Sequence, residues 1–538
     1  MQENKNSSFI KGAVTLGTAG LISKVLGFAA KIILPRLIGD VGVGIYEKAY
    51  PFYSILLVFS TAGLPIALAK LISDRTARGH YKYAYRIFRV CLWMSIITGL
   101  VLSVVMIGLS RPLIVLFGWK METLYSILAI APAVFFVSIM ATYRGFFQGL
   151  QNMVPTAISQ VTEQFVRILT IIILVYILIP YGVKYGAAGA TFGAVTGSIA
   201  GLLVLLVIYR KKKEEIWQFK DSSPAGEFSS FKTAKKILFL AGPITFGALI
   251  TPLMRFIDSA IVPARLAAAN FSSPTGLFGQ FGMAMTLVRF PTILTLSLAT
   301  ALVPAISGAF ARENGEQIKH RSESSLRLTI LLALPAAGGL FIMARPLTAV
   351  IFGSPESAVP LRFVALGVLF ISLKQISGAI LQGMGKPLIP ARNLLIGAIF
   401  NAVINYTLTA MPRFGIRGAA LGTVTGFAVG AFLNLLYARK WTRFNFKPGS
   451  MLLKPLTAVA VMSVVVRRGF TVVSTFYNLF IAEYSYTFTT FTMVGIGALT
   501  YLMLLLLLNE IKYGDLVLLP RFGKKIAEVL FKWGLVEK

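Results

Sequence analysis

Long apolar runs recur along almost the whole chain and leave little freedom in its fold. Segments of about 20 or more apolar residues can cross ~30 Å of hydrocarbon as helices, because a helix satisfies its own backbone hydrogen bonds there. Hydrophobic residues make up 56% of the 538 residues and charged residues only 13%, a balance that soluble domains do not have. The sequence therefore predicts an all-α, polytopic membrane protein.

Fourteen membrane spans are expected. They lie near residues 10–34, 49–73, 88–110, 123–143, 155–180, 186–209, 235–263, 279–306, 326–345, 358–383, 390–411, 416–438, 453–475 and 487–508. Lysine and arginine concentrate in the N-terminus and in alternate connections: 74–90, 210–236, 307–327, 439–454 and 509–538. By the positive-inside rule these segments, and with them both termini, are predicted to be cytoplasmic. The formal net charge of +32 then reflects topology, and no nucleic-acid partner is expected.

An internal repeat divides the first twelve spans into two halves. Three patterns occur twice: a glycine-rich pattern at 182–197 and again at 415–426, Phe147-Gln148-Gly149-Leu150 and Leu381-Gln382-Gly383-Met384, and Leu64-Pro65 and Val303-Pro304. A duplicated six-helix unit explains all three at a similar offset. Because six is an even number, both copies enter the membrane in the same orientation. We expect two lobes related by a pseudo-twofold axis along the membrane normal.

The chain is predicted to have five parts. They are an N-terminal six-helix lobe (1–210), a cytoplasmic linker (211–233), a C-terminal six-helix lobe (234–440), two additional transmembrane helices (441–508) and a cytoplasmic amphipathic helix (509–538). In the last part, apolar residues such as Phe522, Ile526 and Val529 recur at helical spacing, and lysines take the other face. Two interpretations of this helix are open: it lies on the anionic inner leaflet, or it packs on the protein's own cytoplasmic loops.

Basic residues inside the apolar runs outnumber acidic ones. The eleven cations are Lys24, Lys31, Lys48, Lys70, Arg167, Arg255, Arg289, Arg362, Lys374, Arg467 and Arg468, and the three nearby carboxylates are those of Glu47, Glu163 and Asp258. A charge at the bilayer centre costs ~2.5–3.5 kcal/mol on insertion scales, so such residues usually face a water-filled cavity. The excess of positive charge predicts a cavity for an anion. Its candidate contacts are Lys24, Lys31, Lys48, Arg255 and Arg289.

Two pairs of charges could instead be local. Glu163 and Arg167 are four residues apart, and Arg255 and Asp258 are three apart, so each pair shares one face of a helix. We expect Glu163 and Arg167 to form an internal ion pair. For Arg255, a local pair with Asp258 and a place in the cavity are both open.

Four motifs resemble a known family. They are Ser23-Lys24-Val25-Leu26-Gly27-Phe28, Arg144-Gly145-Phe146-Phe147-Gln148-Gly149, Ser159-Gln160-Val161-Thr162-Glu163-Gln164-Phe165-Val166-Arg167 and Arg289-Phe290-Pro291. They resemble the stage V sporulation protein B group. That group belongs with the MurJ-type lipid II flippases in the multidrug/oligosaccharidyl-lipid/polysaccharide (MOP) exporter superfamily. The resemblance covers nearly the whole chain.

The resemblance implies a lipid II flippase of the bacterial plasma membrane, with a part in peptidoglycan and polysaccharide biosynthesis, in the cell wall and cell shape, and in sporulation. Such a protein moves a pyrophosphate-linked sugar headgroup to the outer leaflet by alternating access, as a monomeric unit among membrane lipids. Arginine can grip phosphate in bidentate fashion, and lysine acts on it as a point charge. In the family, the basic residue of the first-span motif lines the central cavity. Lys24 holds that position in this sequence.

The resemblance also implies a site for a coupling ion. In some MurJ-like proteins a sodium site joins an acidic residue on the seventh helix to polar residues on the eleventh and twelfth. Asp258, Asn401, Asn405 and Thr423 fall in similar places, although relatives with that site have a second carboxylate where asparagine stands here. No cofactor is expected beyond such a monovalent cation, and no metal site is expected.

Other functions fit the sequence less well. An exporter of another undecaprenyl-linked polysaccharide precursor would use the same cationic cavity, so it is the main alternative. A drug or cation antiporter of the same superfamily would need carboxylates for its cargo. A membrane enzyme acting on the same lipid would need catalytic carboxylates on the outer face, yet the longest outer loop of the repeats, 265–280, contains neither Asp nor Glu. We therefore expect a transporter rather than an enzyme.

Overall fold

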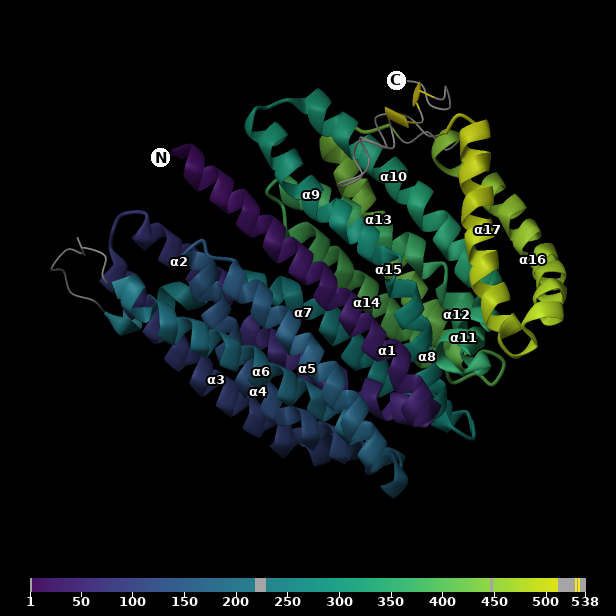
Figure 1. Ribbon diagram of the computed structural model, residues 1–538, viewed down its shortest axis with the longest axis horizontal. Helices are drawn as coiled ribbons and strands as arrows, with labels where there is room; N and C mark the ends of the chain where they lie inside the picture. The colour runs from purple at the N-terminus through teal and green to yellow at the C-terminus, as the bar shows by residue number, and fades with distance from the viewer. Residues whose placement is uncertain (1, 218–228, 446–448, 511–527, 530, 533–538) are drawn as a thin grey trace. The chain divides into compact units, whose positions relative to one another are not determined.

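The computed structural model describes residues 2–217, 229–445, 449–510, 528–529 and 531–532, and these residues form helices joined by short connections, without strands (Figure 1). The all-α prediction is confirmed. Residues 218–228 of the predicted linker lie outside the described residues. So do 511–527, 530 and 533–538, which make up most of the predicted amphipathic helix.

The chain forms two compact units. Unit 1 comprises Met1–Ala264 and Ser273–Gly279, and unit 2 comprises Arg265–Ser272 and Gln280–Lys538. Unit 1 therefore includes most of the seventh helix, which the predicted boundary at residue 234 assigns to the C-terminal lobe. Contacts within unit 1 explain this: the Trp119 indole N–H donates to the Ser259 carbonyl at 3.1 Å. The five predicted parts of the chain stay a prediction.

Unit 1 is a bundle of long helices. They are α1 (Gln2–Thr61), α2 (Leu64–Thr76), α3 (Tyr81–Leu116), α4 (Glu122–Gly149), α5 (Val154–Leu178), α6 (Val183–Trp217) and most of α7 (Ser230–Ala268). A short 3-10 turn, Ile179–Tyr181, joins α5 to α6. Helix α6 packs against both α4 and α5, and α3 packs against α4. Figure 1 shows these helices in purple to teal.

Unit 2 contains more and shorter helices. They are α8 (Pro274–Arg289, whose first residues belong to unit 1), α9 (Thr292–Ala311), α10 (Gly315–Ile342), α11 (Ala344–Phe352), α12 (Ala358–Val364), α13 (Gly367–Gly383), α14 (Leu388–Leu408), α15 (Ile416–Thr442), α16 (Lys454–Phe480) and α17 (Ser485–Leu507). Helices α14 and α15 form a close pair, as do α16 and α17, which lie side by side in Figure 1. The carboxylate of Glu510 fastens the second pair to α10, because it lies 3.0 Å from Arg327 Nη2 and 2.9 Å from Lys454 Nζ.

The lengths and composition of the described helices give a number of candidate membrane crossings. Among the described residues, twelve helices are long and apolar enough to cross a membrane, or thirteen if the bent pair Pro355–Val364 and Gly367–Gly383 is one span. The first candidate, Thr15–Thr76, has 62 residues, whereas about 20 suffice for one crossing. The predicted number of fourteen stays a prediction. The expected single helix at 279–306 is wrong: α8 ends at Arg289 and α9 begins at Thr292. Pro291 lies in the break, where it has no N–H to continue the helix.

One packing detail recurs in both units. A Cβ added to Gly149 at the end of α4 would come within 2.7 Å of the Cβ of Ile72 on α2. A Cβ added to Gly383 at the end of α13 would come within 2.7 Å of the Cβ of Ile306 on α9. These two glycines hold matching places in the sequence repeat, so the same close helix contact occurs once in each half of the repeat.

We expect Gly149→Ala and Gly383→Ala each to lower the thermal unfolding midpoint of the purified protein in detergent. An added methyl group in a tight contact costs ~1–3 kcal/mol through overpacking. Gly108→Ala is the matched control, because a Cβ at this helical glycine would meet nothing within 4 Å. Equal midpoints for all three variants would contradict the packing described here.

Candidate functional site

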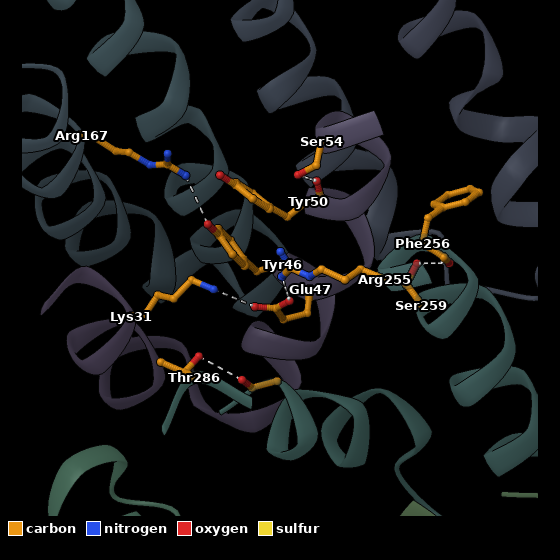
Figure 2. A network of polar contacts seen from close by, with 11 residues as sticks. Lys31, Tyr46, Glu47, Tyr50, Ser54, Arg167, Arg255, Phe256, Ser259 and Thr286 are labelled. Carbon is orange, nitrogen blue, oxygen red and sulfur yellow. Dashed lines mark hydrogen bonds and ion pairs between the residues drawn. The ribbon is translucent and has the colours of Figure 1, made fainter. Parts of the chain in front are cut away.

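A network of charged side chains lies in unit 1 between α1 and α7 (Figure 2). Lys31 Nζ lies 3.5 Å from Glu47 Oε1, and Arg255 Nη2 lies 3.2 Å from Glu47 Oε2. Each oxygen of one carboxylate thus faces a different cation. The Lys31 and Arg255 side chains are 31% and 22% exposed, against 12% for Glu47. We call these three residues the Glu47 cluster. Its formal charge is positive, and its cations are more accessible than its anion.

The break in α1 makes this cluster possible. Lys31 and Glu47 are both on α1, 16 residues apart, and a straight helix would separate them by ~24 Å. Gly39 lies midway between them and has non-helical backbone angles, φ 65° and ψ −178°. This region of conformational space is essentially restricted to glycine. The chain changes direction at Gly39, and the two halves of α1 bring the ammonium and the carboxylate together.

Tyrosines extend the polar site along the second half of α1. The rings of Tyr46 and Tyr50 stack with centroids 5.3 Å apart. Arg167 of α5 donates from Nη2 to the Tyr46 hydroxyl at 3.3 Å, and its guanidinium lies 5.4 Å from the centroid of the Tyr50 ring. Figure 2 shows Arg167 reaching toward these two rings. A phenol oxygen and an aromatic face therefore serve as the partners of this cation.

The predicted ion pair between Glu163 and Arg167 is wrong. Glu163 Oε2 instead accepts a hydrogen bond from Arg144 Nη2 at 2.8 Å. Arg144 also donates to Ser159 Oγ, from Nη2 at 2.8 Å and from Nε at 3.2 Å. Residues four apart share a face of a helix, but this spacing does not decide which neighbour each side chain meets. The guanidinium of Arg144 on α4 reaches the carboxylate of Glu163 on α5 instead.

The other predicted anion contacts are dispersed. Lys24 lies two helical turns before Lys31 on α1; its side chain is exposed, and it is not a member of the Glu47 cluster. Lys48 is only 2% exposed, and its Nζ donates to Thr275 Oγ1 at 2.8 Å. Arg289, at the end of α8, belongs to unit 2 and is partly buried. Unit 1 thus brings together Lys31 and Arg255 but not Lys24. For Arg255, the structure shows a long-range partner on α1.

The predicted ion site involves residues of both units, and each is described within its own unit. Asp258 is 7% exposed on α7 of unit 1. In unit 2, Asn401 and Asn405 of α14 are fully buried, and Asn405 Nδ2 donates to Asn401 Oδ1 at 3.0 Å. Thr423 of α15 is 2% exposed. The two asparagines, one turn apart on α14, are therefore in contact with each other. No group of three or more His, Cys, Asp or Glu side chains in the described part of the chain could hold a metal ion.

Sequence reasoning overlooked two participants near this site. The motif that contains Arg144 does not indicate a partner for it, and none of the predictions from the sequence includes the tyrosines of α1. A signal for the tyrosines was present, because Tyr46, Tyr50 and Tyr53 follow each other at helical spacing beside Glu47. The partner of Arg144 lies in another helix, 19 residues away, and no local spacing rule indicates it.

Known proteins match the chain over most of its length. The family model described as "Polysaccharide biosynthesis protein" matches residues 9–310, and the model described as MatE matches residues 243–407. Stage V sporulation protein B of Bacillus subtilis (strain 168) is 31% identical over 525 residues, which are 96% of this chain and 99% of that protein. Lipid II flippase MurJ of the same organism is 25% identical over 498 residues, 89% of this chain and 90% of that protein.

Solved structures show the same fold. Lipid II flippase MurJ in an inward closed conformation has a TM-score of 0.68 at 17% identity and covers 94% of this chain and 100% of its own. An inward-facing multidrug resistance MATE family transporter of the MOP superfamily has a TM-score of 0.66 at 18% identity and covers 80% of this chain and 98% of its own. The helices long enough to cross a membrane, the matching family models and the curated relatives together define a multi-pass membrane transporter of the MOP superfamily rather than an enzyme.

Within that superfamily, the chain belongs to the polysaccharide biosynthesis protein family. The resemblance inferred from the sequence motifs is thereby confirmed.

The buried hydrogen bond from Lys48 to Thr275 can be tested directly. We expect Thr275→Val to lower the thermal unfolding midpoint, because it leaves the buried ammonium without its hydroxyl partner at a cost of ~1–3 kcal/mol. Lys48→Met should not lower it, since an apolar side chain of similar volume often replaces a buried charge without loss. The double variant should then behave like Lys48→Met. If Thr275→Val lowers the midpoint by the same amount in the wild-type protein and in the Lys48→Met variant, the hydrogen bond between Lys48 and Thr275 does not contribute to stability.

Proposed function

We propose that this protein is a flippase for a lipid-linked oligosaccharide, and that its substrate is the peptidoglycan precursor lipid II. It would move the lipid from the inner to the outer leaflet by alternating access. One observation carries this proposal: two cations on candidate membrane-spanning helices, Lys31 and Arg255, share the carboxylate of Glu47 and are more exposed than Glu47 is. A site with excess positive charge suits an anionic headgroup, and the pyrophosphate of an undecaprenyl-linked sugar is such a group.

The chemistry of the two cations fits a phosphate. The guanidinium of Arg255 offers a planar set of donors, and the ammonium of Lys31 is a compact charge that can follow a moving oxygen. Lys24, exposed two turns before Lys31 on the same helix, offers the next positive charge along α1. The tyrosines beside the cluster give aromatic faces and a hydroxyl close to the position of a headgroup. All of these contacts are non-covalent, as transport requires.

A second candidate shares the same site. An exporter of another undecaprenyl-linked polysaccharide precursor would need the same pyrophosphate contacts, and the description of the matching family, polysaccharide biosynthesis, favours it as the alternative. A drug or cation antiporter is less suited, because the Glu47 cluster has the wrong sign of charge for a cationic cargo. The MatE family model matches only residues 243–407, and the solved MATE transporter shares the fold at 18% identity.

The proposal includes a location and an assembly state. The protein would lie in the bacterial plasma membrane with both termini cytoplasmic, which follows from the distribution of Lys and Arg between the connections. It would work as a monomeric unit surrounded by membrane lipids, with no nucleic-acid partner. A role in sporulation is supported by the similarity to stage V sporulation protein B.

Substitutions at Lys31 test the anion site. We expect Lys31→Gln to weaken lipid II binding by about tenfold, the loss of one charge-assisted hydrogen bond. Lys31→Glu should weaken it further, because a second carboxylate repels the pyrophosphate, and Lys31→Arg should be the mildest change. Binding to the purified protein and complementation of a flippase-depleted cell are the measurements.

Lys232→Glu, at an exposed lysine of α7, is the control for the same change of charge away from the cluster. It should bind and complement like the wild-type protein. If Lys31→Glu also does so, the role of Lys31 in anion passage is wrong. Equal binding of lipid II and of another undecaprenyl pyrophosphate-linked sugar would favour the second candidate.

We also propose that a monovalent cation such as sodium couples to transport and that no other cofactor takes part. In unit 2, the buried asparagine pair of α14 and Thr423 of α15 offer neutral oxygen atoms. The family resemblance adds Asp258 as the candidate carboxylate. Oxygen atoms of this kind suit a hard cation, though one carboxylate gives only one charge.

A sodium gradient should therefore stimulate lipid II transport in proteoliposomes when compared with a potassium gradient. Asn405→Leu should remove this stimulation and leave lipid II binding near the wild-type level. Asn393→Leu is the control, because Asn393 is a buried asparagine of the same helix that bonds to Asn434 instead. A wild-type protein indifferent to sodium, or an equal loss in both variants, would count against a specific ion site.

A further inference from the structure

Glu47 holds an unusual position in the proposed substrate site. Its two oxygens face two cations from different segments, Lys31 before the break in α1 and Arg255 on α7 (Figure 2). A phosphate bound between an ammonium and a guanidinium would present two oxygens to them in the same way. The carboxylate thus stands where the anionic group of the proposed substrate would bind.

The two ion pairs described for Glu47 are longer than the ion pair of Glu163. The Glu47 pairs measure 3.5 and 3.2 Å, whereas strong charge-assisted hydrogen bonds measure about 2.7–2.9 Å. Arg144 and Glu163 are 2.8 Å apart, and Ser159 fixes the same guanidinium. Glu163 is therefore held as part of the framework, while the contacts of Glu47 with Lys31 and Arg255 are long enough to be exchanged for contacts with an anion.

We propose that Glu47 is a built-in competitor of the substrate, a carboxylate that offsets part of the positive charge of Lys31 and Arg255 in the empty site and is displaced by the pyrophosphate. This inference rests on the proposed function. It assigns to Glu47 the part of lowering affinity so that the headgroup can leave on the outer side. No bond is made or broken, since one anion replaces another on the same two cations.

Two physical arguments support this assignment. Without Glu47, the two cations would lose the counter-ion that they share whenever the site is empty, and uncompensated charge inside the membrane is costly. With substrate bound, the nearby carboxylate repels the phosphate oxygens and opposes tight retention. A carrier must bind its cargo and release it within one cycle. Because Glu47 is part of the chain and always lies beside the two cations, it limits how tightly the headgroup is held and so favours its release.

Displacement of Glu47 would also act on the backbone. The Lys31 contact joins the two halves of α1 across the break at Gly39, and the Arg255 contact joins α1 to α7. An anion that takes both cations away from Glu47 removes both ties at once. Substrate binding is thereby connected to the freedom of α1 at its break, which is a two-state element of the kind that alternating access needs.

The test compares carboxylate and amide at position 47. The probes are lipid II and undecaprenyl pyrophosphate, binding to the full chain in lipid nanodiscs, with transport measured in proteoliposomes. Glu47→Gln keeps the shape and removes the competing charge. We expect it to bind both probes about tenfold more tightly, the gain of about one charge-assisted contact, and to turn over more slowly because release is slowed.

Glu163→Gln is the matched control, because it removes the same charge from an ion pair of the framework. It should not tighten binding. Glu47→Asp keeps the charge but withdraws it by one methylene, so it should bind more tightly than wild type but less tightly than Glu47→Gln. This variant also serves if Glu47→Gln does not fold, as judged by its thermal unfolding midpoint.

The outcomes separate this inference from the proposed function. If Lys31→Gln weakens binding but neither change at Glu47 strengthens it, Glu47 is not a competitor, and the anion site stands. If Glu47→Gln weakens binding, the carboxylate holds the site together and the inference is overturned. If Lys31→Gln binds the probes like wild type, the cluster is not the substrate site, and both ideas fail together.

Discussion

The backbone at Gly39 is the constraint on which the site depends. Its φ of 65° and ψ of −178° are accessible to glycine and costly for any residue with a Cβ. Without this break, α1 would be a rod of 60 residues, ~90 Å long and far longer than the bilayer is thick. With it, Lys31 and Glu47 meet, and Arg255 finds a carboxylate to share. A residue without a side chain thus decides which side chains can form the cluster.

The second constraint is that charged side chains inside the membrane need partners. In unit 1, a few carboxylates and several neutral groups provide them. Glu47 serves two cations and Glu163 serves Arg144. Two further cations rely on neutral groups, because Arg167 contacts tyrosines and Lys48 contacts a threonine hydroxyl. Neutral partners satisfy hydrogen bonding without cancelling charge. The interior of the unit therefore stays electropositive even though its cations have partners.

The sequence predicted the fold class and the excess of cations because both depend on composition and run length. It failed where a contact depends on which helix lies next to which. The expected pair of Glu163 and Arg167 follows from spacing on one helix, yet Arg144 of α4 takes the carboxylate instead. The contact of Arg255 with Glu47 spans 208 residues. A spacing rule reaches a few residues along a helix and cannot indicate such a partner. The hydrogen bond between Asn405 and Asn401, four residues apart on α14, is a contact within that reach.

Tight and loose ion pairs have different uses in a protein that must move. The 2.8 Å pair of Arg144 and Glu163, braced by Ser159, stabilises the contact between α4 and α5 in one geometry. A pair of that strength at the Glu47 cluster would hold α1 to α7 permanently and exclude an incoming anion. Longer contacts to a shared carboxylate leave each cation partly satisfied and partly available. In a rigid protein, ion pairs of this length would contribute little to stability. In a transporter, the same length allows an incoming anion to replace the carboxylate.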